Sequence, residues 1–227
     1  MPNERHVVIT GGTGALGSAV VARFLREGAS CHVTWIEPRE LEHFAHAKQV
    51  QLHQLELGDE NAVTQFYASL PALWASVHLA GGFAMSPIEK TSAEDMLKMF
   101  RLNAMTCFLC CREAVKAMRR GGDGGRIVNV AARPAVQPAG GMIAYATSKA
   151  AVATITQSLA EEVKDARILV NAVLPSIMDT PTNRKSMPNA DFTKWPKVQE
   201  VAETIAFLAS SQNTLTSGAL IPVYGRS

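Results

Sequence analysis

The sequence has little net charge and contains no long apolar run. Its 22 Lys and Arg residues nearly balance 20 Asp and Glu residues, so the formal net charge is +2. Nucleic-acid binding normally leaves a strong basic excess, so we expect no nucleic-acid partner. No stretch approaches the roughly 20 apolar residues of a membrane helix, so we expect no membrane partner either.

A secretory leader is also not expected. The apolar run from Val7 to Thr10 is short and leads directly into glycines. Signal peptides have a longer apolar region followed by a cleavage site. We therefore expect a cytoplasmic protein, in which cysteines stay reduced.

Cysteine is scarce, and three of the four cysteines lie close together. Cys107, Cys110 and Cys111 occupy one apolar stretch with helical periodicity, whereas Cys31 stands alone. Their spacing resembles half of a metal site, but no neighbouring His and no second Cys pair completes it. Free cysteine packs as a small hydrophobe, so we expect buried thiols and no metal.

Short β-branched runs alternate with longer helical patterns along the whole chain. The expected strands cover residues 6–10, 31–36, 50–57, 76–80, 125–130, 167–173 and 219–223. The expected helices cover 15–26, 59–70, 92–120, part of 141–164, and 198–210. This alternation predicts one α/β domain over residues 1–227, a Rossmann-type doubly wound fold. Its mostly parallel seven-stranded sheet would carry helices on both faces.

The least regular segment covers residues 176–197 and is rich in Pro, Asn, Ser and Thr. It follows the sixth expected strand, and open α/β sheets bind ligands beyond the carboxyl ends of their strands. We interpret the segment as a substrate lid, the alternative being an ordinary long loop.

A glycine-rich loop separates the first strand from the first helix. Gly11, Gly14 and Gly17 permit a tight turn and close approach to a pyrophosphate, which the helix N-terminus would attract. A plain glycine-rich turn is the alternative. A P-loop that binds nucleoside triphosphates is excluded, because no Lys-Ser or Lys-Thr follows the last glycine.

In a dinucleotide-binding fold, the residues after the second strand should contact the adenosine ribose. An acidic side chain there binds the ribose hydroxyls and repels a 2′-phosphate. Glu37 therefore favours NAD(H) and Arg39 favours NADP(H), although either could be an ordinary surface charge. Both cofactors stay open.

Tyr145 and Lys149 lie four positions apart, on one face of an expected helix. Acid–base chemistry near neutrality requires a tyrosine pKa below its usual value of about 10. A lysine cation and a nicotinamide cation nearby would both favour the ionised phenol. Such a pair is also common on helix surfaces, so it does not identify a function alone.

In combination, these motifs resemble the short-chain dehydrogenase/reductase family over nearly the whole chain. The resemblance implies catalytic roles for Tyr145, Lys149 and Asn103, the last holding a proton-relay water. The expected cofactor-binding residues are Gly11, Thr13, Gly14, Ala15, Leu16, Gly17, Glu37, Arg39, Glu56, Leu57, Ala80, Gly81, Gly82, Asn103, Tyr145, Lys149, Pro175, Ile177 and Thr180.

One position departs from the family pattern. The family's catalytic serine lies thirteen residues before the tyrosine, where this chain has Ala132. Alanine cannot donate a hydrogen bond to a developing oxyanion, and loss of such a donor costs about two to three orders of magnitude in rate.

A narrower resemblance, to quinoid dihydropteridine reductases, would explain Ala132, because that branch also lacks the serine. Its matching segments are 11–18, 80–82, 141–145, 172–175, 179–181, 183–188, 190–192 and Trp195. That branch selects NADH with an Asp at the end of its second strand, where this chain has Trp35.

We therefore expect an NAD(P)H-dependent reductase of a quinonoid dihydropterin or a similar planar heterocycle, with Tyr145 as the proton donor. An alternative is a ketone or alcohol oxidoreductase, of 3-oxoacyl or ketosteroid type, that tolerates Ala132. A non-catalytic cofactor-binding sensor is a third hypothesis.

Family resemblance also implies a homodimer or homotetramer. Family members pair through two long helices, here the one over 92–120 and the one that carries Tyr145. Met96, Met99, Met105, Cys107 and Cys110 could form the paired surface, or could instead pack against the sheet.

Overall fold

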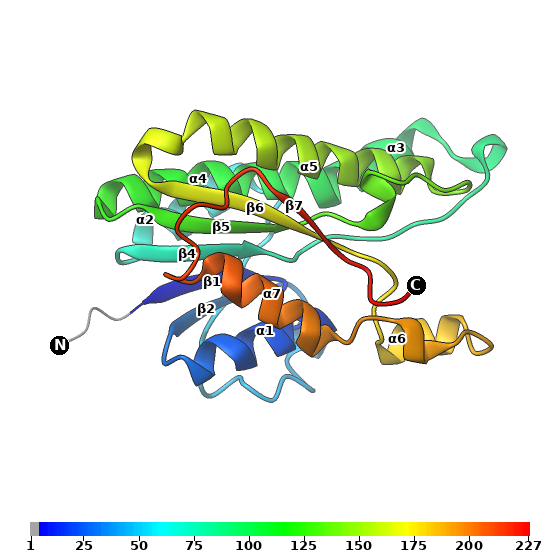
Figure 1. The fold of residues 1–227 in the computed structure, drawn as a ribbon, viewed down its shortest axis with the longest axis horizontal. Coiled ribbons are helices and arrows are strands. Elements are labelled where there is room, and N and C mark those ends of the chain that lie inside the picture. Colours follow the sequence, from blue (N-terminus) through cyan, green and yellow to red (C-terminus); the bar gives the residue numbers. More distant parts are fainter. Residues whose placement is uncertain (1–4) are drawn as a thin grey trace.

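Seven strands form one sheet in the computed structural model, which describes residues 5–227 (Figure 1). Their order is β3-β2-β1-β4-β5-β6-β7, and every pairing is parallel. The strands are β1 (His6–Thr10), β2 (Ser30–Trp35), β3 (Gln51–Gln54), β4 (Leu73–His78), β5 (Gly125–Val130), β6 (Ile168–Pro175) and β7 (Leu220–Val223). The predicted fold class is confirmed.

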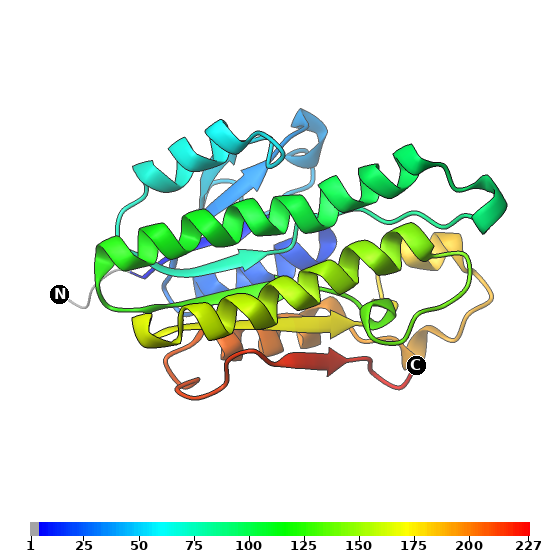
Figure 2. The same cartoon turned by 90° about the horizontal axis from the view of Figure 1, so that it is seen from above.

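Helices cover both faces of this sheet. They are α1 (Ala15–Arg26), α2 (Glu60–Ser69), α3 (Ala93–Phe100), α4 (Thr106–Gly121), α5 (Ile143–Glu162), α6 (Pro181–Ser186) and α7 (Val198–Ala209). Helices α2, α4 and α5 lie over one face, and α1 and α7 over the other (Figures 1 and 2). Because both faces are covered, consecutive residues of β1, such as Val7, Val8 and Ile9, are all buried.

The helix boundaries largely follow the expected local signals. Asp59 caps α2 by accepting hydrogen bonds from the N–H groups of Asn61 and Ala62. Gly122 ends α4 in the left-handed conformation, with φ of 78°. The helix predicted over residues 92–120 is not continuous, because a π-helical turn at Arg101–Met105 separates α3 from α4. Helix α6 was not predicted.

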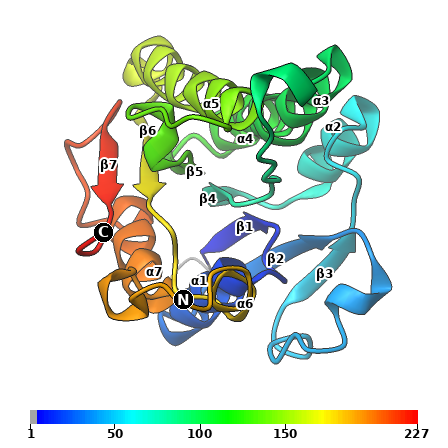
Figure 3. The same cartoon turned by 90° about the vertical axis from the view of Figure 1, so that its right-hand side faces the viewer.

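The carboxyl ends of the strands face one side of the molecule (Figure 3). Chain order reverses between β1 and β4, which places a ligand-binding crevice at this point in open α/β sheets. The hydroxyl of Thr10 joins the two strand ends, because it accepts hydrogen bonds from the N–H groups of Leu79 and Ala80. The glycine loop and the segment after β4 therefore lie side by side.

The segment 176–197 is folded and lies beyond these strand ends, with α6 near the carboxyl edge (Figures 1 and 3). Trp195 is buried, and the C-terminal Arg226 donates hydrogen bonds to the carbonyls of Lys194 and Thr193. The position of segment 176–197 fits a substrate lid, and this role stays a prediction. None of the helices in the described part of the chain has both the length and the apolar character to cross a membrane.

Candidate active site

The loop between β1 and α1 has the shape of a phosphate-binding turn. Gly11 takes a φ of 63°, which favours glycine, and a Cβ on Gly17 would collide with the Gly11 carbonyl oxygen. Gly14 is the N-cap of α1, and no side chain accepts from the first N–H groups of this helix. The open helix N-terminus fits the pyrophosphate of a dinucleotide. Leu16 is buried in the core, so only its backbone could take part.

A glutamate that we had not predicted lies beside this loop. The carboxylate of Glu40 accepts hydrogen bonds from the Thr13 hydroxyl (2.6 Å) and from the N–H groups of Ile36 (3.1 Å) and Glu37 (2.8 Å). Partial burial favours the neutral acid, but these hydrogen bonds outweigh it and hold the pKa of Glu40 below its usual value. A fixed carboxylate therefore follows β2, at the expected ribose position.

The two charges predicted to read the ribose are exposed. Glu37 is the N-cap of a 3-10 turn at Pro38–Glu40, and Arg39 lies within this turn. The spacing from Glu37 to Glu40 is that of a capping box, a signal that could have identified Glu40. Trp35, at the end of β2, contains the one buried side-chain N or O atom within residues 5–227 that lacks a hydrogen-bond partner, its indole Nε1. An unpaired donor at this strand end fits a site for a polar ligand.

Glu56 and Leu57, which the family resemblance assigns to the adenine part of the cofactor, differ in exposure. Glu56 is exposed, and its carboxylate accepts a hydrogen bond from the Gly58 N–H (2.9 Å). Leu57 is buried in the cluster beneath α2. The adenine role of these two residues stays a prediction.

Asn103 is buried at the centre of the site, within the π-helical turn. Its Oδ1 accepts from the Gly82 N–H (3.0 Å), and its Nδ2 donates to the Gly82 carbonyl (3.1 Å) and to Ser148 Oγ (3.0 Å). A Cβ on Gly81 would collide with the Asn103 amide. The glycines after β4 thus leave room for the asparagine, and the π-helical turn, a feature frequent at functional sites, carries it.

Tyr145 and Lys149 lie on α5 beside Asn103. The Lys149 ammonium is buried and donates a hydrogen bond to the Val130 carbonyl (2.8 Å). Burial lowers the pKa of Lys149 to about 8 and raises the pKa of Tyr145 to about 12. We expected the lysine to lower the tyrosine pKa, but in the protein alone burial dominates. Tyr145 therefore holds its proton at neutral pH and is set to donate it.

Ala132 lies directly after β5, where the backbone is extended and the side chain buried. Its methyl group offers no hydrogen-bond donor to a substrate. Across the carboxyl edge, Pro175 ends β6, Ile177 is exposed, and Thr180 caps α6 by accepting from the Asn183 N–H. Pro175, Ile177 and Thr180, which the family resemblance assigns to cofactor binding, therefore extend from the end of β6 into the start of the candidate lid.

An apolar wall beside Tyr145 was missed by the sequence analysis. The ring of Phe83 meets that of Tyr145 edge to face, with centroids 4.9 Å apart, yet 62% of Phe83 is exposed. Met85 is equally exposed, and its side chain approaches Gly141. An exposed aromatic ring against the Tyr145 ring, with an exposed methionine two residues further on, fits an apolar ligand.

Two expectations about the cysteine-rich helix need correction. The cysteines are buried and unbridged, as expected, but His78 of β4 lies against Cys111, so the conclusion that no His approaches them is wrong. Met99, Cys107 and Cys110 are also buried, which removes them from any surface between subunits. Met105 of the predicted set is exposed, and the other exposed large apolar residues of this region are Leu97, Phe100, Leu102 and Phe108.

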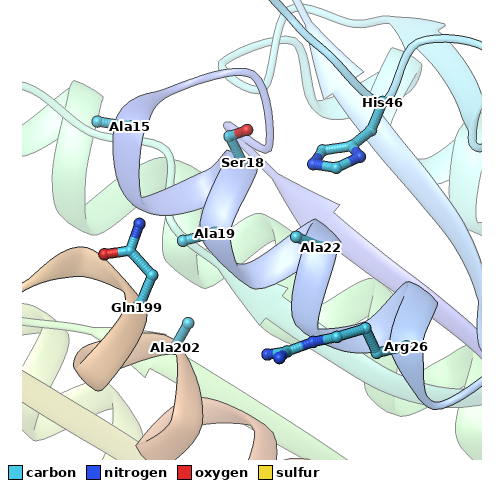
Figure 4. Close-up of a pocket in the computed structure, with 8 residues that line it drawn as sticks. All are labelled: Ala15, Ser18, Ala19, Ala22, Arg26, His46, Gln199 and Ala202. Atoms are coloured by element: carbon cyan, nitrogen blue, oxygen red, sulfur yellow. The ribbon is translucent and has the colours of Figure 1, made fainter.

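A separate hollow lies between α1, α7 and the β2–β3 connection (Figure 4). Ala15, Ser18 and Ala19 of α1 line one side, and Gln199 and Ala202 of α7 line another. Of the predicted site residues only Ala15 lines this hollow, so the side chain of Ala15 points toward α7.

Comparison with known proteins agrees with this geometry. Residues 5–191 match the family model described as short chain dehydrogenase. The chain is 28% identical to cyclopentanol dehydrogenase of Comamonas sp. (strain NCIMB 9872), covering 98% of this chain and 96% of that one. It is 28% identical to 3beta-hydroxysteroid dehydrogenase of Mediterraneibacter gnavus, over 81% of this chain and 70% of that one. The solved structure of ElxO with NADP bound superposes with a TM-score of 0.89, at 25% identity and 98% coverage of both chains.

Proposed function

The chain belongs to the short-chain dehydrogenase family and is an NAD(P)-dependent oxidoreductase, and we propose that it interconverts an apolar secondary alcohol and its ketone. The observation that supports this proposal is the exposed ring of Phe83, edge-on to Tyr145. The relatives named above include dehydrogenases of a cyclic alcohol and of a steroid, both apolar secondary alcohols. This replaces the dihydropterin reductase as our first hypothesis.

Tyr145 performs the proton transfer in the proposed reaction. Its phenol is protonated at neutral pH, so it can donate a proton to a carbonyl oxygen during reduction. In the oxidative direction the proton of the alcohol passes to the phenolate form, which re-forms the phenol. Lys149 is fixed by the Val130 carbonyl, and Asn103 by Gly82 and Ser148, so both polar groups stay in place beside α5. Bound NAD(P)(H) supplies or accepts the hydride.

Substrate orientation depends on the apolar wall. Phe83 packs against one side of the Tyr145 ring, and Met85 adds exposed apolar surface nearby, which favours a hydrophobic ring or chain. Because Ala132 provides no donor, the carbonyl oxygen relies on the Tyr145 hydroxyl. We therefore expect slow turnover compared with relatives that carry the serine.

Glu40 makes NADH the preferred cofactor in this proposal. Its ionised carboxylate is anchored to Thr13 of the glycine loop, so it would accept from ribose hydroxyls and repel a 2′-phosphate. The exposed Arg39 is the competing feature and would favour NADPH.

A quinonoid dihydropterin is the second candidate substrate, and Ala132 is the observation that favours it. Hydride addition to that conjugated ring spreads charge over several nitrogens and a remote carbonyl. A single oxyanion donor is then less important, while Tyr145 can still supply the proton.

The test is a steady-state comparison of purified enzyme with NADH and NADPH. Cyclopentanone and a 3-ketosteroid represent the first hypothesis, and quinonoid dihydropterin the second. We expect turnover of the ketones, and a loss of about 10²–10⁴-fold in kcat in Tyr145→Phe with cofactor binding retained. Turnover of the pterin alone would reject the ketone proposal.

We also propose that the protein acts as a homo-oligomer. Leu97, Phe100, Met105 and Phe108 expose apolar area along α3, the π-helical turn and α4, which suits a second copy of the chain. Sedimentation equilibrium should give a dimer or a tetramer, and Phe108→Glu should weaken it. A wild-type monomer would contradict the proposal.

A further inference from the structure

Three metal-ligand side chains converge beneath the active site, and the proposed reaction uses none of them. His78 ends β4, and Cys107 and Cys111 lie one turn apart on α4. Their exposed fractions are 4%, 6% and 2%. Their ligand atoms all lie within 4.8 Å of one another, although His78 and Cys111 are 33 positions apart in sequence.

The distances between these atoms fit a tetrahedral metal. The two sulfurs are 4.0 Å apart, and the Cys111 sulfur is 3.5 Å from His78 Nδ1. A tetrahedral zinc ion with ordinary Zn–S and Zn–N bonds places sulfurs about 3.8 Å apart and sulfur about 3.5 Å from nitrogen. The Cys107–Cys111 and Cys111–His78 distances are therefore within a few tenths of an ångström of those of a tetrahedral face, and the third pair, Cys107 and His78, lies within 4.8 Å.

A fourth ligand is available on the neighbouring strand. Asn129 of β5 places Oδ1 2.8 Å from His78 Nδ1 and 3.4 Å from the Cys111 sulfur. The Asn129 Nδ2 donates to Thr156 Oγ1 (2.9 Å), which directs the amide oxygen toward the cluster.

The histidine is also oriented as a metal ligand requires. His78 Nε2 lies 2.9 Å from Ser76 Oγ, which in turn lies 2.9 Å from the Tyr67 hydroxyl. In the metal-free chain Nδ1 donates to Asn129 Oδ1, which can only accept, so metal binding would move this proton to Nε2, where Ser76 can accept it. The lone pair of Nδ1 would then face the two thiols. Metal-binding histidines typically hold their second nitrogen in this way.

We propose that His78, Cys107 and Cys111 bind one Zn²⁺ ion, with the Asn129 amide oxygen as the fourth ligand. Two thiolates balance the charge of the ion, so burial leaves no net charge uncompensated. All four positions belong to protein atoms, which is typical of structural zinc sites. The ion would clamp α4 to β4 and β5, one turn beyond Asn103, and release of two thiol protons would accompany its binding.

The test measures zinc in protein refolded with and without Zn²⁺ and then dialysed against a weak chelator. We expect about one zinc per chain in the wild type, and almost none in Cys107→Ser and Cys111→Ser. Cys110→Ser is the matched control, because Cys110 lies on the same helix and is buried, but is not part of the cluster. It should bind zinc like the wild type.

Spectroscopy of the wild type decides the matter if the serine variants do not fold. Co²⁺ in place of Zn²⁺ should give the visible bands of a tetrahedral ion and a thiolate-to-metal charge-transfer band of two-sulfur intensity. Zinc should also raise the melting temperature of the wild type and of Cys110→Ser. Wild type that takes up no metal, a Co²⁺ spectrum without thiolate bands, or zinc retained in Cys111→Ser would each overturn the proposal.

Discussion

Asn103 donates a hydrogen bond of 3.0 Å to Ser148 Oγ, and this bond joins the π-helical turn to the helix that carries Tyr145 and Lys149. The same hydroxyl donates to the Tyr145 carbonyl (2.7 Å). Ser148 is buried and therefore fixes the amide of Asn103 relative to the turn of α5 that carries Tyr145.

Ser148→Ala should lower kcat about tenfold, because one hydrogen bond of about 1–1.5 kcal/mol would be lost from the positioning network. The KM for cofactor should change little. Thr147→Ala is the matched control, since Thr147 is adjacent but exposed. Steady-state kinetics of both variants measure the effect. An equal loss of kcat in Ser148→Ala and Thr147→Ala would show that Ser148 has no specific positioning role.

Ala132→Ser should raise the rate of ketone reduction by up to about 10²-fold, because the new hydroxyl would donate to the developing oxyanion. Ala131→Ser is the control, because Ala131 is buried in the core cluster and cannot serve the substrate. Single-turnover reduction of cyclopentanone measures the effect. An unchanged rate would count against carbonyl chemistry and favour the pterin hypothesis.

Glu40→Gln should improve kcat/KM with NADPH relative to NADH by about tenfold, because it removes a fixed negative charge near the expected 2′-phosphate. Glu42→Gln, an exposed change in the same connection, should leave the ratio unaltered. If the wild type already prefers NADPH and Glu40→Gln leaves the ratio of the two kcat/KM values unchanged, Arg39 and not Glu40 determines the cofactor preference.

Acid should destabilise the fold through His32. Its ring bridges His6 (3.1 Å) and His53 (3.2 Å) across three neighbouring strands. Burial, followed by repulsion from His53 and His6, lowers the pKa of His32 to about 4 from 6.5. Between pH 6.5 and 4 the unfolded chain binds the extra proton and the folded chain does not, so stability falls as pH falls.

The change His32→Gln should therefore reduce the acid sensitivity of the folded state. Relative to the variant, the wild type should lose roughly 2 kcal/mol of unfolding free energy between pH 7 and pH 5. Urea denaturation at the two pH values measures this loss. His43→Gln, at an exposed position, should keep the wild-type pH dependence; the same flattening in that control would argue against His32.

Local patterns predicted the fold correctly, and they brought Tyr145 and Lys149 onto one helix, whose catalytic roles stay a prediction. Alternating apolar runs and helical periods placed seven strands in order, because each strand and helix depends on neighbouring residues. They did not reveal the π-helical turn at Arg101–Met105, because the apolar period there reads as one continuous helix. Phe83 was missed for a related reason, since one aromatic residue after a glycine pair has no periodicity.

By itself, the sequence determined the alternation of elements, the glycine loop and the four-residue spacing of Tyr145 and Lys149. These features are set by short-range geometry along the chain. Only the tertiary structure decided that Glu40 joins Thr13, that Asn103 bonds Ser148, and that His78 meets Cys107 and Cys111. Those contacts arise because parallel strands and their crossover helices bring distant residues to shared edges and layers, and no local spacing encodes which side chains meet there.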